Sequence, residues 1–103
     1  MNTKSKTFVR LSQAILSLRT EKEAACFLRD LMTEGELREF SNRLRAAEML
    51  SEKISYKEIE VETGLSSTTV ARVAKWLNGK EGGYRLVIGR LHHDTPRSRR
   101  GLS

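Results

Sequence analysis

The sequence has little of what sheets, disulfide frameworks and membrane spans require. Its 103 residues include one proline and one cysteine, and no long β-branched alternation of the kind that surface strands show. Cys26 cannot form an internal disulfide, which agrees with a reducing compartment, and its apolar neighbours predict a buried structural thiol. No apolar run approaches the roughly 20 residues of a membrane span, and the polar N-terminal residues lack the apolar segment of a signal peptide. We therefore expect a helical protein in the cytoplasm, with no membrane contact.

Catalytic and metal-binding patterns are also absent from the sequence. The chain contains no glycine-rich phosphate loop, no Cys-x-x-Cys or His-x-x-x-His spacing, and no Ser, His and Asp set on separate elements. His92 and His93 are adjacent near the C-terminus, where solvated side chains are commoner than metal ligands. The sequence thus predicts that the protein is not an enzyme and uses no cofactor and no metal.

The net charge of +6 is unevenly distributed along the chain. Residues 1–65 contain eleven Lys and Arg against eleven Asp and Glu, whereas residues 66–103 contain eight against two. A basic excess confined to one end is typical of contact with a polyanion, although a charged surface can also serve solubility alone. We interpret it as an indication of nucleic-acid binding, because the excess begins within the motif described next.

Residues 55–65 predict a short capped helix followed by a sharp turn. Ser55 can accept the backbone N–H of Glu58 while the Glu58 carboxylate reaches back to the Ser55 N–H, as in a capping box. Ile59 then faces inward, and Gly64 can take the left-handed conformation that ends a helix. Leu65 follows as the apolar residue of the turn. The segment therefore has the form of the first half of a helix-turn-helix.

A second helix follows, with Ser66 or Ser67 as its cap. Val70, Val73 and Leu77 recur at steps of three and four and form an inward stripe. The opposite face carries short hydroxyls and long cations, namely Ser67, Thr68, Ala71, Arg72 and Lys75. Two capped helices joined at one glycine are typical of a DNA-binding helix-turn-helix, which we place at about 55–78.

In such motifs the start of the second helix enters the major groove and the first helix crosses the DNA backbone. Arg72 and Lys75 are then placed to reach phosphates or guanine edges, and Lys57 is placed to reach a phosphate. The hydroxyl residues nearest the bases or their bridging waters are Ser66, Ser67, Thr68 and Thr69. Each hydroxyl can alternatively serve only to cap or solvate the start of the helix.

Three amphipathic helices are expected upstream of this motif, at about 5–19, 20–32 and 33–51. Capping boxes mark two of the starts, Thr20 with Glu23 and Thr33 with Glu36. Downstream, a glycine pair separates the motif from a further short helix at 84–91, for which a strand at 84–88 is the alternative. We expect one domain at 1–91 and a basic, disordered tail at 92–103.

The upstream helices carry more apolar surface than the helix-turn-helix can cover. A symmetric dimer would cover it and would place two recognition helices about 34 Å apart, one turn of DNA. A monomeric bundle whose helices cover one another is the alternative.

Three segments of the chain resemble the Trp repressor superfamily, and in particular its YerC/YecD-like Trp-repressor-related proteins. These segments are residues 42–50, 55–59 and 64–72, and the Gly-Gly-Tyr-Arg-Leu-Val run at 82–87 matches the YerC/YecD branch. The resemblance covers about 8–91. It implies an all-α fold of about six helices, an intertwined homodimer and a bacterial transcription regulator that binds operator DNA.

The same resemblance implies a possible effector site at Arg43 and Arg72, which match the two arginines that hold the tryptophan corepressor in Trp repressors. The glycine that follows the second arginine in those proteins is Val73 here, and Trp76 can itself fill the space of an indole ligand. We therefore expect Arg43 to be an interhelix or phosphate-facing cation, and L-tryptophan not to be a corepressor.

These observations predict a sequence-specific DNA-binding transcriptional regulator, a repressor, that acts as a homodimer on double-stranded DNA. Two alternatives remain at this stage. One is a helical protein-interaction adaptor with a basic end, and the other is a DNA binder of the replication-initiation type.

Overall fold

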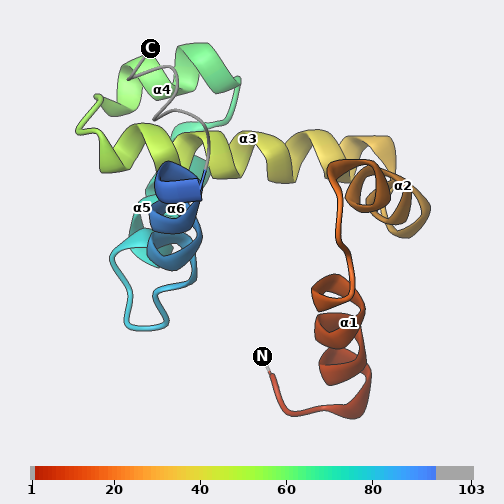
Figure 1. The fold of residues 1–103 in the computed structure, drawn as a ribbon. Helices are drawn as coiled ribbons and strands as arrows, with labels where there is room; N and C mark the ends of the chain where they lie inside the picture. Colours follow the sequence, from red (N-terminus) through yellow and green to blue (C-terminus); the bar gives the residue numbers. More distant parts are fainter. Residues whose placement is uncertain (1, 95–103) are drawn as a thin grey trace. The chain divides into compact units, whose positions relative to one another are not determined.

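The computed structural model describes residues 2–94, which form six helices joined by short connections and contain no strand (Figure 1). The predicted all-α fold of about six helices is therefore confirmed. The chain divides between Leu37 and Arg38 into two compact units, which we call the N-terminal unit and the C-terminal unit. The helices are α1 (Lys6–Leu16), α2 (Glu21–Leu31), α3 (Glu34–Ser51), α4 (Tyr56–Thr63), α5 (Ser67–Leu77) and α6 (Gly83–Asp94).

The helices of the N-terminal unit begin at capping side chains. The Ser5 hydroxyl accepts the Phe8 N–H at 3.3 Å at the start of α1, and the Thr20 hydroxyl accepts the Glu23 N–H at 3.0 Å at the start of α2. The Glu23 carboxylate accepts the N–H of Arg19 at 2.8 Å, so it closes the cap one residue earlier than a capping box would. The predicted helix starts are confirmed, since capping depends only on nearby residues.

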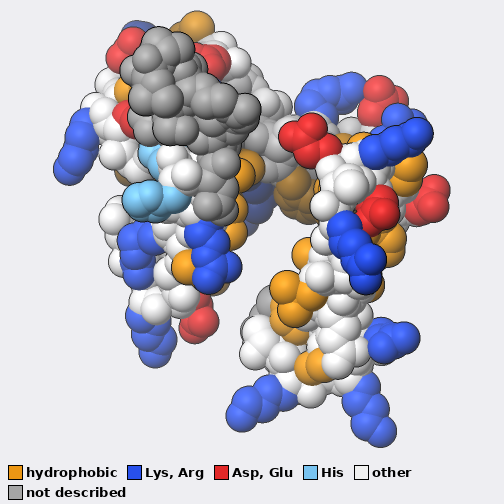
Figure 2. Space-filling view, in the orientation of Figure 1, with side chains coloured by type: hydrophobic (Ala, Val, Ile, Leu, Met, Phe, Trp, Pro, Cys, Tyr) orange, Lys and Arg blue, Asp and Glu red, His pale blue; other side chains and the backbone are white. Residues whose placement is uncertain are grey.

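No residue of α1 or α2 is buried. Large apolar side chains such as Ile15 and Leu16 are 48% and 82% exposed, and Figure 2 shows hydrophobic side chains at the surface of α1. Cys26 is also exposed, so the prediction of a buried thiol is wrong for this chain. The physical reason is that α2 has apolar residues but no element of the described chain that buries them.

Helix α3 begins at a complete capping box. Thr33 donates its N–H to the Glu36 carboxylate at 2.9 Å, and its hydroxyl accepts the Glu36 N–H at 3.1 Å. The helix ends at Ser51, as predicted, and its last turns contribute Ala46, Ala47 and Met49 to the interior. Its C-terminal half therefore shares one hydrophobic core with α4, α5 and α6.

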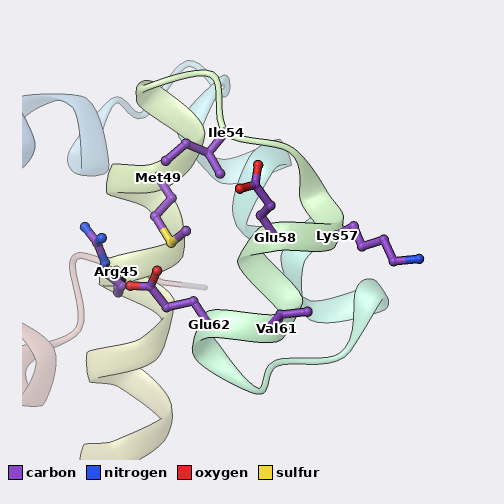
Figure 3. A pocket seen from close by; sticks show the side chains of 7 residues that line it. All are labelled: Arg45, Met49, Ile54, Lys57, Glu58, Val61 and Glu62. Atoms are coloured by element: carbon purple, nitrogen blue, oxygen red, sulfur yellow. Dashed lines mark hydrogen bonds and ion pairs between the residues drawn. The ribbon is translucent and has the colours of Figure 1, made fainter.

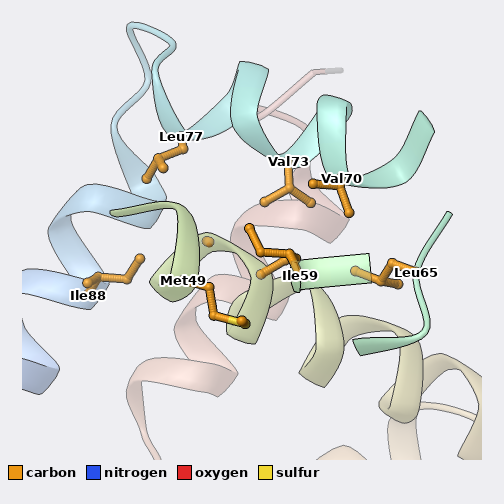
Figure 4. Close-up of a cluster of buried hydrophobic side chains, with 9 residues drawn as sticks. Met49, Ile59, Leu65, Val70, Val73, Leu77 and Ile88 are labelled. Atoms are coloured by element: carbon orange, nitrogen blue, oxygen red, sulfur yellow. The ribbon is translucent and has the colours of Figure 1, made fainter. Parts of the chain in front are cut away.

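The C-terminal unit contains the hydrophobic core (Figure 4). Ile59 of α4 and Val70 and Val73 of α5 are its largest fully buried side chains, which confirms the predicted inward positions. Full burial of one such side chain is worth about 1.5–3 kcal/mol relative to its exposure. The whole cluster is Ala46, Ala47, Met49, Ile59, Leu65, Val70, Val73, Leu77 and Ile88.

Helix α6 replaces the alternative of a strand at 84–88. It begins after Gly82, whose φ of +72° is left-handed, and it continues through Asp94. His92 and His93 are therefore helical, and the predicted tail does not begin at residue 92. The remainder of that tail, 95–103, lies outside the described residues. None of the six described helices combines the length and the apolarity that a bilayer crossing requires.

Candidate nucleic-acid interface

Local hydrogen bonds fix both the start of α4 and the turn that joins it to α5. The Ser55 hydroxyl caps α4 by accepting the Glu58 N–H at 3.2 Å, and it donates to the Glu58 carboxylate at 3.3 Å. Gly64 ends the helix in the predicted left-handed conformation, with a φ of +75°. Thr63, which sequence analysis did not predict to be buried, donates its hydroxyl to the Ile59 carbonyl at 2.7 Å and accepts the Leu65 N–H at 3.2 Å. The turn between α4 and α5 is thus held by the two hydrogen bonds of the Thr63 hydroxyl and by the left-handed backbone at Gly64.

Ser66, and not Ser67, caps α5. Its hydroxyl accepts the Thr69 N–H at 3.1 Å and donates to the Thr69 hydroxyl at 3.1 Å. Ser67 and Thr68 are exposed, and their side chains form no hydrogen bond with the described residues. The structure therefore divides the four hydroxyls into a capping pair and an outward pair.

The two faces of α5 differ sharply in burial. Val70, Val73 and Leu77 are at most 7% exposed. The outward face contains no acidic residue, and its two cations, Arg72 and Lys75, form no ion pair within the region that the structure describes. All five residues predicted for that face are exposed, namely Ser67, Thr68, Ala71, Arg72 and Lys75. A continuous face of hydroxyls and unpaired cations suits contact with base edges and phosphates.

Two acidic side chains of α4, those of Glu58 and Glu62, point in a different direction from the Lys57 side chain (Figure 3). A cleft of about 380 Å³ separates α3 from α4, and the Glu62 carboxylate meets the Arg45 guanidinium there at 2.9 Å. This hydrogen bond raises the pKa of Arg45 and so stabilises the charged form of its guanidinium. Lys57 also lines this cleft, and in Figure 3 its ammonium group points away from Arg45 and Glu62. Lys57 therefore presents its charge outward while the charge of Glu62 is compensated.

Arg43 lies on α3 and has partners on its own helix. Its guanidinium contacts the Glu39 carboxylate at 2.9 Å and lies 5.8 Å from the centre of the Phe40 ring. Arg43 also acts on α6, because burial raises the pKa of Tyr84 and the positive charge of Arg43 partly opposes that rise. Arg72 is exposed and is not engaged in any of these contacts. Of the two arginines predicted as an effector pair, only Arg43 is held in place by the described chain.

An apolar groove lies beside Arg43, in the C-terminal unit, and has a volume of about 510 Å³. Trp76 contributes to it from α5 and is 55% exposed, whereas Val73 is 1% exposed and belongs to the core. The residues that line this groove are Leu44, Trp76, Glu81, Gly83, Tyr84 and Val87.

A second, polar cleft of about 350 Å³ is lined by residues from the ends of α3 and α5 and the starts of α4 and α6. Sequence analysis did not predict it, because its residues come together only when the four helices pack. The one feature of the sequence that points to this cleft is Lys53, a cation immediately upstream of the helix-turn-helix. The lining residues are Leu50, Ser51, Lys53, Tyr56, Ala74, Leu77, Asn78 and Arg85.

The arrangement of α3 to α6 can be compared with known proteins. The sequence profile of the family described as Trp repressor protein matches residues 6–92 of the chain. The chain belongs to the Trp repressor family. The match begins at the start of α1 and ends within α6, so it includes both units.

Individual relatives agree with this membership. The Bacillus subtilis protein YerC, described as uncharacterized, is 36% identical over 88 residues, which are 85% of each chain. A crystal structure of a TrpR-like protein from Eubacterium eligens has a TM-score of 0.81 at 40% identity and covers 87% of this chain and 93% of its own. A proposed Trp repressor from Staphylococcus aureus has a TM-score of 0.83 at 31% identity, with 92% and 98% covered.

The Trp repressor family is a family of DNA-binding regulators and not of enzymes. At this level the predicted function agrees with the comparisons.

Proposed function

We propose that the protein is a sequence-specific transcriptional repressor that binds operator DNA as a homodimer. The observation that carries the proposal is the outward face of α5. Arg72 and Lys75 are exposed there and have no ion pair with the described residues, while the opposite face is buried in the core. In this proposal α5 enters the major groove, and Ser67 and Thr68 contact base edges or bridging waters. Lys57 contacts a phosphate, while Ser66 and Thr69 position the start of the helix.

A homodimer accounts for the apolar surface that the single chain leaves open. No residue of α1 or α2 is buried, and the groove lined by Trp76 and Tyr84 is also open. A second copy offers the same apolar stripes in return, so that one symmetric contact covers both surfaces. Two copies also present two recognition helices to a palindromic operator.

We propose further that L-tryptophan is not the corepressor. Val73 follows Arg72 and fills part of the core at 1% exposure, and Trp76 already contributes an indole to the neighbouring groove. Arg43, the other expected arginine of an effector site, is paired with Glu39. Calorimetry with L-tryptophan should show no saturable heat, and saturable binding at micromolar concentration would overturn this part of the proposal.

Selection of bound fragments from random duplexes tests the main proposal. A sequence-specific dimer enriches a palindromic site whose half-sites lie about one helical turn, roughly 34 Å, apart. Enrichment of a single half-site would contradict the dimer, and recovery of unrelated fragments would contradict sequence specificity.

The contribution of Arg72 is tested on the selected site. Arg72→Ala should weaken binding by about 1–3 kcal/mol if Arg72 contacts a base. The matched control is Arg90→Ala, because Arg90 is an exposed arginine of α6 and lies outside the helix-turn-helix. Equal affinities for the two variants would remove Arg72 from the interface.

The salt dependence of binding separates a repressor from an adaptor that binds an acidic protein. Each phosphate contact on duplex DNA makes the slope of log K against log salt steeper by about 0.9. We expect a steep negative slope on the duplex, whereas a flat slope would favour the adaptor.

A further inference from the structure

The polar cleft described above has the composition of an anion site. Of the residues that line it, Lys53 and Arg85 carry positive charge, and none is acidic. Tyr56 and Asn78 add hydrogen-bonding groups at its walls. The remaining lining residues are Leu50, Ser51, Ala74 and Leu77, so the rest of the wall is mostly apolar.

Arg85 is held in position by the backbone around it. Its guanidinium donates to the carbonyl of Leu77, the last residue of α5. A Cβ atom at Gly82 would lie 3.1 Å from the same guanidinium, so the absence of a side chain there leaves room for it. Because a guanidinium has five N–H groups and this contact uses one, the others remain available to an acceptor. The cation is thus fixed in place before any ligand arrives.

Lys53 lies at the opposite end of α4 from the glycine turn. It has a φ of +66°, in the left-handed region, directly before the segment that caps α4. Within residues 2–94 its ammonium group forms no ion pair. Tyr56 is the first residue of α4 and is 45% exposed, and its hydroxyl forms no hydrogen bond with the described residues.

The cleft borders the outward face of α5. Ala74 and Asn78 line the cleft, and they follow Ala71 of that face at helical steps of three and four. Asn78 is exposed and donates one side-chain N–H to the Ala74 carbonyl at 3.0 Å, which leaves its second side-chain N–H available to an acceptor. The cleft therefore adjoins the C-terminal end of the face of α5 that the proposed function assigns to DNA.

We propose that this cleft binds a backbone phosphate of the DNA that α5 contacts. Lys53 supplies the direct charge contact, the Tyr56 hydroxyl donates a hydrogen bond, and Arg85 provides a second, preorganised cation. The proposal rests on the proposed function, and it adds a phosphate contact that lies outside the exposed face of α5.

The test compares two loop lysines with the same substitution. Lys53→Asn removes the charge, and asparagine accepts the left-handed conformation at low cost. Lys80→Asn is the control, because Lys80 is an exposed lysine of the loop between α5 and α6 and does not line the cleft. Thermal melts establish that both variants fold as the unaltered protein does. Affinities for one duplex are then measured between 50 and 200 mM salt.

We expect the salt slope of Lys53→Asn to become less steep by about 0.9, which corresponds to a loss of affinity across this range that is about three- to fourfold smaller than in the unaltered protein. The slope of Lys80→Asn should stay unchanged. Equal changes in the two variants, or no change in Lys53→Asn, would overturn the phosphate site while leaving DNA binding intact. Failure of the unaltered protein to bind any duplex would instead overturn the proposed function and the phosphate site together.

Discussion

The two units of the chain use the same local devices but differ in what they bury. Both contain helices that begin at hydroxyl caps, with Thr20 in the N-terminal unit and Ser55 in the C-terminal unit. In the C-terminal unit the apolar stripes of four helices meet and leave Ile59 and Val70 with no exposed surface. In the N-terminal unit no residue of α1 or α2 is buried.

This difference shows that the features that form a helix are not the same as those that stabilise a fold. A cap and a favourable sequence define where a helix begins, but most of the stability of a protein helix comes from packing its apolar face. The C-terminal unit finds that packing within one chain. The N-terminal unit has the apolar face without the packing, which is why its stability is expected to depend on a second copy.

A charge on the apolar face of α1 is the most direct test of whether the N-terminal unit depends on a second copy. Ile15→Asp should weaken self-association by about 3–5 kcal/mol, because the proposed dimer would bury a carboxylate without a partner. Gln13→Asp is the matched control on the same helix, since Gln13 is exposed and, among the described residues, its side chain bonds the Arg10 side chain alone. Sedimentation equilibrium measures both. Dimers of equal strength would show that α1 lies outside the interface.

The core of the C-terminal unit is tested at two neighbouring positions of α4. Ile59→Ala should lower the free energy of unfolding by about 2–5 kcal/mol, because Ile59 is fully buried and leaves a cavity. Val61→Ala should change it by less than about 0.5 kcal/mol, because Val61 is 80% exposed. Chemical denaturation gives both values, and similar losses would mean that Val61 is covered in solution.

Two glycines, one in each unit, test how local backbone conformation affects the stability of the protein. Gly64→Ala should cost about 1–2 kcal/mol, because the left-handed conformation is unfavourable for a residue with a Cβ. Gly35→Ala, at the start of α3, should instead stabilise the protein by about 0.4–1 kcal/mol through a less flexible unfolded chain. Neither new Cβ meets an atom within 4 Å, so the melting temperatures report backbone effects alone. A change of the melting temperature in the same direction in both variants would contradict these opposite backbone effects.

The smallest expected effect concerns the ion pair between α3 and α4. Both partners are about half exposed, with 45% of Arg45 and 50% of Glu62 accessible. A double-mutant cycle of Arg45→Gln and Glu62→Gln should give a coupling of about 0.2–1 kcal/mol. High salt should reduce it further, and a salt-independent coupling would indicate a hydrogen bond rather than a charge interaction.

The local features of the fold could be predicted from sequence because they depend on neighbouring residues. The caps at Thr20, Thr33 and Ser55 and the left-handed glycine at Gly64 each involve groups within a few positions. The inward stripe of α5 follows from helical geometry alone. The same reasoning predicted a hydroxyl and cation face on α5, and the structure leaves that face exposed.

Features that depend on the packing of distant elements could not be predicted in this way. Cys26 has apolar neighbours in sequence, but burial requires another element against α2, and none in the described chain provides it. Thr63 is polar, yet it is buried because its hydroxyl bonds the backbone on both sides of the turn. The polar cleft needs the C-terminus of α3 and the start of α6 in one place, and no local pattern encodes that distance.

Trp76 gives this protein an internal optical reporter. It is the chain's one tryptophan, it lies on the recognition helix, and it is half exposed at the rim of the apolar groove. The emission of an indole moves to shorter wavelength when water is removed from around it. The fluorescence spectrum of the unlabelled protein therefore records directly whether the groove is open or covered, at any dilution at which emission can be detected.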